Sequence, residues 1–275
     1  MKKISIFISC FLLLIILTSC ASTGGSEGSY NVYYGEPESK NFSLSGKTEI
    51  TKPKDIEEQK TIDLNGKIYS LQYHKTYETA ISGVKKIDKY SKYVTYKNES
   101  VYADIQLETG MLLMFCNLDE DVRTRSGNLT EDEARVIADS TLLSVYGTFT
   151  QEEYEYETTV YSDTDFVRYT IVYRKYVWGV PSKDAIQISV NMNGDVVAIN
   201  AKYLGLFSFA ESQISKEDID GAISTLYETC SDRWSIGAET LIIDAEGDYY
   251  ISARLYNNKN GNKFETPIEV YVNVN

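Results

Sequence analysis

Hydrophobic and polar residues alternate along much of the chain, and this alternation predicts β-strands. We predict a hairpin over residues 61–73, where two alternating runs flank Asn65-Gly66. This dipeptide is the strongest short-range signal for a two-residue turn, because both turn residues must adopt positive φ. A second hairpin is predicted over residues 101–116. Residues 77–90 stay ambiguous, because their apolar spacing is helical but a central glycine disfavours a helix.

Two helices of the same design are predicted, over residues 129–146 and 214–230. Each begins with a hydroxyl at the N-cap, Thr130 or Ser215, and an acid three residues later, which is the capping-box pattern. Apolar residues then follow at i, i+3, i+4 and i+11, which predicts one buried face per helix. These residues are Ala134, Ile137, Ala138 and Val145 in the first helix, and Ile219, Ala222, Ile223 and Cys230 in the second.

Each predicted helix is followed by alternating runs that predict strands. The runs are 154–161, 166–177, 185–191 and 195–203 after the first helix, and 239–244, 249–256 and 268–273 after the second. The second copy lacks the last strand, so one sheet edge is left exposed or needs a cover. A sheet with one apolar face buries it against the nearest apolar partner, here its own helix. We therefore predict an α+β fold of tandem small domains, each with one helix packed on an antiparallel β-meander.

The first twenty residues predict export and lipid attachment. Two lysines precede an apolar run over residues 4–17, as in a secretory signal peptide. The run is shorter than the roughly 20 residues that cross a bilayer. Its ending, Leu-Thr-Ser-Cys20, resembles the lipobox of bacterial lipoproteins, in which the cysteine thiol receives diacylglycerol before cleavage. The resemblance implies that a lipid on Cys20 anchors the protein at the extracytoplasmic face of the cell membrane.

Three further segments resemble PepSY-like domains, which are extracytoplasmic modules of peptidase propeptides and many cell-surface proteins. They are the acid-capped helix, the turn at Gly179-Val180-Pro181, and the strand–turn–strand pattern around Asn193-Gly194. The resemblance covers residues 129–205 well and 214–275 in part. It implies a non-catalytic role, in which the protein inhibits or regulates a protease or binds another protein. The layout also resembles extracytoplasmic regulators of a cell-wall sensor kinase, although these carry a transmembrane anchor.

Together these patterns divide the chain into five parts. We predict a lipoprotein signal peptide over residues 1–19, and a Ser-, Gly- and Glu-rich flexible tether over 20–45. Next come a β-rich region over 46–125, hypothesised to be a degenerate module, a PepSY-like domain over 126–210, and a second one over 211–275 that lacks its last strand.

The charge of the chain narrows its partners. Removing residues 1–19 takes away two of the 27 basic groups and leaves 25 against 40 acidic groups, a net charge of −15. Proteins that bind nucleic acid concentrate Lys and Arg on one face, and no such run occurs here, so we expect no nucleic-acid partner. An acidic chain is also repelled by anionic headgroups, which leaves the lipid as the membrane contact.

Few residues suit catalysis or metal binding, and we predict no catalytic residue, no metal site and no cofactor. His74 is the single histidine and lacks a flanking nucleophile motif. Glu153, Glu155 and Glu157 share one face of a predicted strand, which is more typical of a solvated surface than of a catalytic pair. The Asp163-x-Asp165 pair lacks the further ligands of a calcium loop and is interpreted as a turn.

Two cysteines and one tryptophan complete the candidates. Cys116 and Cys230 lie at positions typical of a protein core, so two buried thiols are favoured over a disulfide, which remains open. Trp178 precedes the Gly-Val-Pro turn, where it either docks a peptide or sugar or covers the core.

We expect a membrane-anchored, non-catalytic protein that binds or regulates another envelope protein, such as a protease or a sensor. The alternatives are a carboxylate-dependent hydrolase of wall polymers and a peptide- or sugar-binding module.

Overall fold

A computed structural model describes most of the chain after residue 29. The described residues are 30–34, 47–79, 91–123, 126–147, 154–162, 166–201, 205, 207–232, 234–243, 247–257 and 267–274. The predicted signal peptide with Cys20, the Asp163-x-Asp165 pair and residues 80–90 lie outside these ranges.

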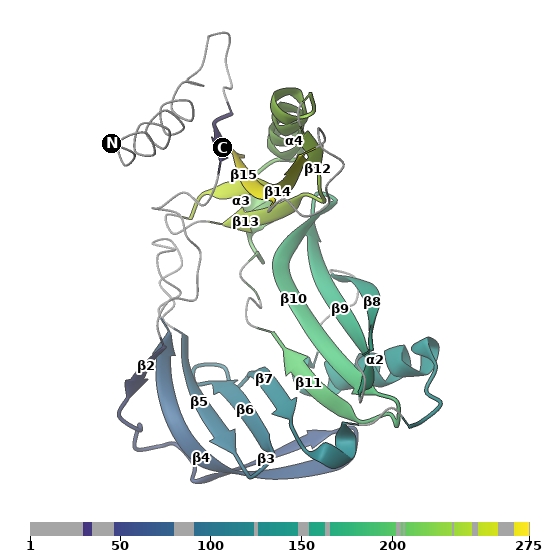
Figure 1. The fold of residues 1–275 in the computed structure, drawn as a ribbon. Helices are drawn as coiled ribbons and strands as arrows, with labels where there is room; N and C mark the ends of the chain where they lie inside the picture. Colours follow the sequence, from purple (N-terminus) through teal and green to yellow (C-terminus); the bar gives the residue numbers. More distant parts are fainter. Residues whose placement is uncertain are drawn as a thin grey trace, which may run out of the picture.

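Fifteen strands of the described residues join into one mixed sheet (Figure 1). They are β1 Val32–Tyr34, β2 Lys47–Ile50, β3 Gln59–Leu64, β4 Lys67–Thr79, β5 Ser91–Lys97, β6 Val101–Gln106, β7 Leu112–Asn117, β8 Tyr154–Ser162, β9 Val167–Val177, β10 Val180–Asn191, β11 Val196–Asn200, β12 Trp234–Ile236, β13 Thr240–Ile243, β14 Tyr249–Asn257 and β15 Ile268–Asn273. The main path runs β1-β15-β14-β13-β10-β11-β7-β6-β5-β4-β2, and β3, β8, β9 and β12 pair beside it. The helices are α2 Glu131–Tyr146, α3 Ala210–Gln213 and α4 Lys216–Cys230, with a short 3-10 helix, η1, at Glu120–Val122.

The predicted fold class is wrong, because the strands do not separate into tandem helix-on-meander domains. Strand β11 pairs with β7, so the predicted N-terminal region and the following segment share one sheet. Strand β10 then pairs in parallel with β13, at Ser182 and Leu241. The β9–β10 hairpin is long enough for its tip to reach the C-terminal strands (Figure 1). This connection joins all the strands into one large sheet, so the fold is mostly β.

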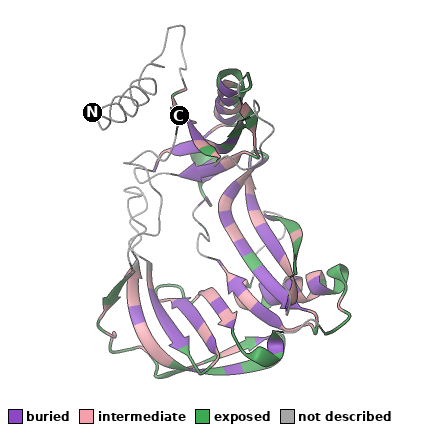
Figure 2. Cartoon of the chain, in the orientation of Figure 1, coloured by how far each residue is buried: buried purple, intermediate pink, exposed green. Residues whose placement is uncertain are grey.

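The first hydrophobic core lies between α2 and the part of the sheet that strands β3 to β11 form. It draws buried side chains from strands far apart in the sequence, including Leu71, Phe115 and Ile188. From α2 it takes Ala134 and Ala138, as predicted, and also Leu142. The predicted Ile137 and Val145 are only partly buried against this core. Buried and less buried residues alternate along much of β9 and β10 (Figure 2), as expected for strands with one face on the core.

The second core lies between α4 and β13–β15. It includes the fully buried Cys230, which confirms its predicted core position, and Leu226. It also contains Val177 and Val180, which flank the tip of the β9–β10 hairpin. One hairpin therefore supplies side chains to both cores.

The local predictions at the helix starts and the first turn are confirmed. Thr130 and Ser215 each cap their helix in a complete capping box. Asn65 and Gly66 have φ values of 56° and 84° between β3 and β4. These features depend on neighbouring residues alone.

Strand β1 covers the sheet edge that the second copy was expected to leave without its last strand. It pairs antiparallel with β15, with Val32 opposite Val272 and Tyr34 opposite Val270. This strand lies inside the segment that the sequence predicts as a tether. Its apolar side chains explain the difference, because Val32 packs against the second core.

Candidate functional site

Trp178 lies at the tip of the β9–β10 hairpin. Trp178 and Gly179 both have positive φ, 52° and 86°, as a tight two-residue hairpin turn requires. The indole Nε1–H donates a hydrogen bond of 3.0 Å to the carbonyl oxygen of Ile214, the residue before the N-cap of α4. The residue is 40% exposed. Its indole nitrogen therefore joins the hairpin to the residue before the N-cap of α4, while the residue stays partly exposed to solvent.

Asp184 of β10 is completely buried, which is rare for a carboxyl side chain. Its Oδ2 accepts a hydrogen bond of 2.9 Å from the backbone N–H of Gly205. Burial raises its pKa to about 6, although a hydrogen bond from Tyr154, the Gly205 N–H and the charge of Lys175 oppose the shift. Within the described residues, its Oδ1 has no hydrogen-bond partner. A raised carboxyl pKa suits a general acid, but a substrate cannot reach a fully buried oxygen, so this group suits a structural role.

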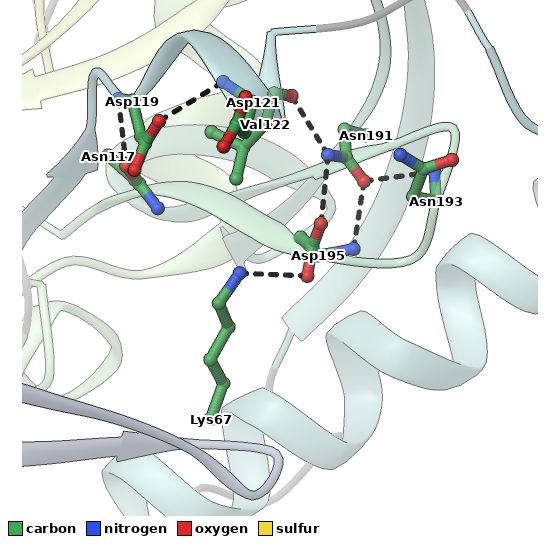
Figure 3. Close-up of polar contacts among 8 residues, drawn as sticks. All are labelled: Lys67, Asn117, Asp119, Asp121, Val122, Asn191, Asn193 and Asp195. Carbon is green, nitrogen blue, oxygen red and sulfur yellow. Dashed lines mark hydrogen bonds and ion pairs between the residues drawn. The ribbon is translucent and has the colours of Figure 1, made fainter.

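A polar network organises the turn between β10 and β11 (Figure 3). The Oδ1 of the buried Asn191 accepts hydrogen bonds from the backbone N–H groups of Asn193, at 3.0 Å, and Asp195, at 2.8 Å. Its Nδ2 donates to the carbonyl oxygen of Val122 in η1, at 2.9 Å. Asp195 in turn pairs with Lys67 of β4 at 3.1 Å (Figure 3). The network joins three segments that are far apart in the sequence.

The same region is rich in side-chain oxygens, and several of them accept hydrogen bonds from backbone N–H groups. Asn117 Oδ1 accepts the N–H of Asp119, and Asp119 Oδ1 accepts the N–H of Asp121 (Figure 3). Across the described ranges, no group of three or more His, Cys, Asp and Glu side chains is placed to hold a metal ion. The side-chain oxygens of Asn117 and Asp119 therefore cap the turn before η1 and the start of η1.

Strand β8 is the strongest candidate for a binding site. It pairs with β9 along its whole length, from Tyr154 opposite Lys175 to Ser162 opposite Val167. No other strand of the described residues pairs with it. Most of its residues are exposed, and the exposed fractions are 51% for Tyr156 and 53% for Val160. Its nine residues make it a long edge strand with apolar side chains at the surface.

The two faces of β8 differ in chemistry. Tyr156 lies on the same face as Val160, and its hydroxyl accepts a hydrogen bond from the Arg135 guanidinium of α2. The opposite face carries Glu155 and Glu157, and Glu157 pairs with Arg174 at 3.4 Å. The alternation of Tyr and Glu is visible in the sequence, but the alternation predicts only a strand. That the strand lies at an edge depends on its pairing.

The cysteines, the histidine and the acidic residues that the sequence singles out do not form one common site within the described residues. Cys116 is half-buried and Cys230 is buried, and both thiols are free, so the two do not form a disulfide. Burial raises the pKa of Cys230. His74 lies in β4, and partial burial with the nearby charges of Lys97 and Lys75 lowers its pKa. Glu153 and Cys20 lie outside the described residues.

Comparisons with known proteins give little further information. No protein-family model matches the chain, and no curated protein sequence matches it. Among solved structures, the Bacillus megaterium YpeB C-terminal domain is similar over 70% of this chain and 80% of that chain, with 15% identity and a TM-score of 0.36. That score is too low to support an argument about fold or function, so the resemblance to PepSY-like domains stays a prediction. In the described part of the chain, no helix is both long enough and apolar enough to cross a membrane.

Proposed function

We propose that this chain is a non-catalytic extracytoplasmic protein, anchored to the membrane through a lipid on Cys20, that binds or regulates another envelope protein. The observation that carries the proposal is the exposed edge strand β8. An edge strand presents unpaired backbone N–H and C=O groups, and an extended segment of a partner adds to it as a further strand. The lipobox and the resemblance of residues 129–205 to PepSY-like domains support the location and the type of role.

The side chains of β8 specify the chemistry of the partner segment. Side chains of an added strand alternate between the two faces of the sheet. On one face they would meet Tyr156 and Val160, and on the other Glu155 and Glu157. Cross-strand pairs of apolar residues and of opposite charges each stabilise a sheet by about 0.2–1 kcal/mol. The expected partner therefore has an extended segment with alternating apolar and basic residues.

A pull-down of the full-length chain from native envelope tests this proposal. Val160→Lys places a charge on the edge strand. Because Val160 is exposed, we expect the substitution to change the stability of the fold little. We expect this variant to lose the partner that the unmodified chain recovers. Ile268→Lys is the control, because it places the same charge at an exposed apolar residue of β15. Recovery of the same partner by both variants would contradict a role for β8, and recovery of no protein at all would contradict the proposal as a whole.

A further inference from the structure

Strand β1 has contacts on both faces of the C-terminal sheet. Its pairing with β15 continues at Asn31, whose carbonyl oxygen accepts a hydrogen bond of 3.1 Å from the N–H of Asn273. On the side of α4, Tyr30 and Val32 pack against the second core. On the opposite side, Tyr33 meets Tyr250 edge to face, with ring centroids 6.2 Å apart. A strand of three residues is thus held by more than its backbone.

Gly221 of α4 leaves the space in which the side chain of Tyr30 packs. A β-carbon on Gly221 would lie 2.1 Å from the hydroxyl oxygen of Tyr30, so the tyrosine occupies the space that a side chain would need. Glycine inside a helix costs about 1 kcal/mol relative to alanine. The packing of Tyr30 gives a physical reason for a glycine at this unfavourable position. Tyr34 adds a second contact to α4, between its hydroxyl oxygen and the Cys230 Sγ at 3.7 Å.

This contact limits how far the C-terminal part of the sheet can lie from residue 20. Cys20 precedes Tyr30 by 10 residues. A fully extended chain spans at most about 3.6 Å per residue, so the two residues are separated by no more than about 36 Å. If β1 were released, the first paired strand would be β2 at Lys47, 27 residues after Cys20, and the limit would rise to about 97 Å.

We propose that β1, seated between β15 and Gly221 of α4, holds the α4–β15 end of the molecule towards the phospholipid bilayer. The β3–β4 end lies at the opposite end of the molecule (Figure 1). On this proposal, the β3–β4 end extends away from the membrane. The exposed acidic residues Glu217, Asp220 and Glu228 on α4 disfavour direct adhesion to anionic headgroups, so the lipid and not the protein surface makes the membrane contact. This inference rests on the proposed lipid anchor.

Energy transfer to the bilayer tests this orientation. The full-length lipidated chain, carrying Cys116→Ser, is placed in phospholipid vesicles that contain an acceptor dye on the headgroups. A donor dye is attached at Ser224→Cys on α4 or, in a second preparation, at Ser70→Cys on β4, since both serines are exposed. We expect transfer from position 224 to exceed transfer from position 70 by about twofold or more, because the short reach limits only the α4 end.

Variants of the Tyr30 contact separate this inference from general attachment. Gly221→Leu and Tyr30→Ala should each reduce the difference in energy transfer between the two donor positions. If Gly221→Leu does not fold, Tyr30→Ala still tests the contact, because it leaves the sequence of α4 unchanged. Tyr227→Ala, which removes an exposed tyrosine from the same helix, should preserve the difference.

Two failures have different meanings. Equal transfer from both positions in a vesicle-bound chain would overturn the orientation while the anchor stands. If the chain does not bind vesicles, or if Cys20→Ser binds them equally well, the lipid anchor itself is wrong and the orientation falls with it.

Discussion

The indole of Trp178 donates its hydrogen bond to the carbonyl oxygen of Ile214, 36 residues later in the chain. This bond ties the tip of the β9–β10 hairpin to the residue before the N-cap of α4. Val177 and Val180, on either side of the turn, lie in the second core. The hairpin tip is therefore held by one polar contact and by apolar packing.

Replacing Trp178 by Phe should lower the free energy of unfolding by about 1 kcal/mol, because the carbonyl of Ile214 loses its side-chain donor. Denaturant unfolding followed by circular dichroism measures this change. Tyr256→Phe, at another exposed aromatic residue, should have less effect. Equal stability of Trp178→Phe and the unmodified chain would show that the bond contributes nothing.

Asp184 should make stability depend on pH in the opposite direction to most acids. Its folded pKa of about 6 lies above its ordinary value of 3.8, so the folded state binds more protons between these values. The group therefore stabilises the fold as the pH falls through 6, and the full gain of about 3 kcal/mol is present below 3.8. Asp184→Asn should remove this contribution. Unfolding titrations of both proteins at pH 7 and pH 5 measure the difference, and identical pH slopes would contradict the prediction.

The two helix caps test whether the sheet unfolds as one unit. Thr130→Ala and Ser215→Ala each remove a capping hydroxyl, which costs about 1 kcal/mol. Because the β9–β10 hairpin contributes to both cores, we expect each substitution to shift one common transition. Calorimetry distinguishes this result from two separate transitions, each moved by one substitution, which would indicate independent units.

The Asn191 network should be sensitive to a change of one atom. Asn191→Asp keeps the oxygen that accepts two backbone N–H groups, but it removes the Nδ2 that donates to the carbonyl oxygen of Val122. The same Nδ2 also donates to Asp195 Oδ2 at 3.2 Å, so the substitution places two carboxylates side by side. We expect a loss of about 2 kcal/mol or more, since a buried group loses its partner. Asn193→Asp is the matched control at an exposed residue of the same turn. Comparable unfolding midpoints of the two variants would argue against this role for the Asn191 amide.

Local features could be predicted from the sequence because neighbouring residues determine them. The capping boxes at Thr130 and Ser215 and the turn at Asn65-Gly66 need only side chains and backbone within a few residues. The apolar period of each helix likewise identifies the face that is buried. The candidate binding strand β8 was predicted as a strand for the same reason, since its alternation lies in the sequence itself.

Only the tertiary structure decided how these elements join. The pairing of β11 with β7, and of β10 with β13, depends on which sheet edges meet, and alternation does not encode a partner. Strand β1 has three residues, too few for a periodic signal, and its partner β15 lies more than 230 residues away. The same holds for the burial of Asp184 and for the space at Gly221 that Tyr30 fills, because both arise from packing between segments that are distant in the chain.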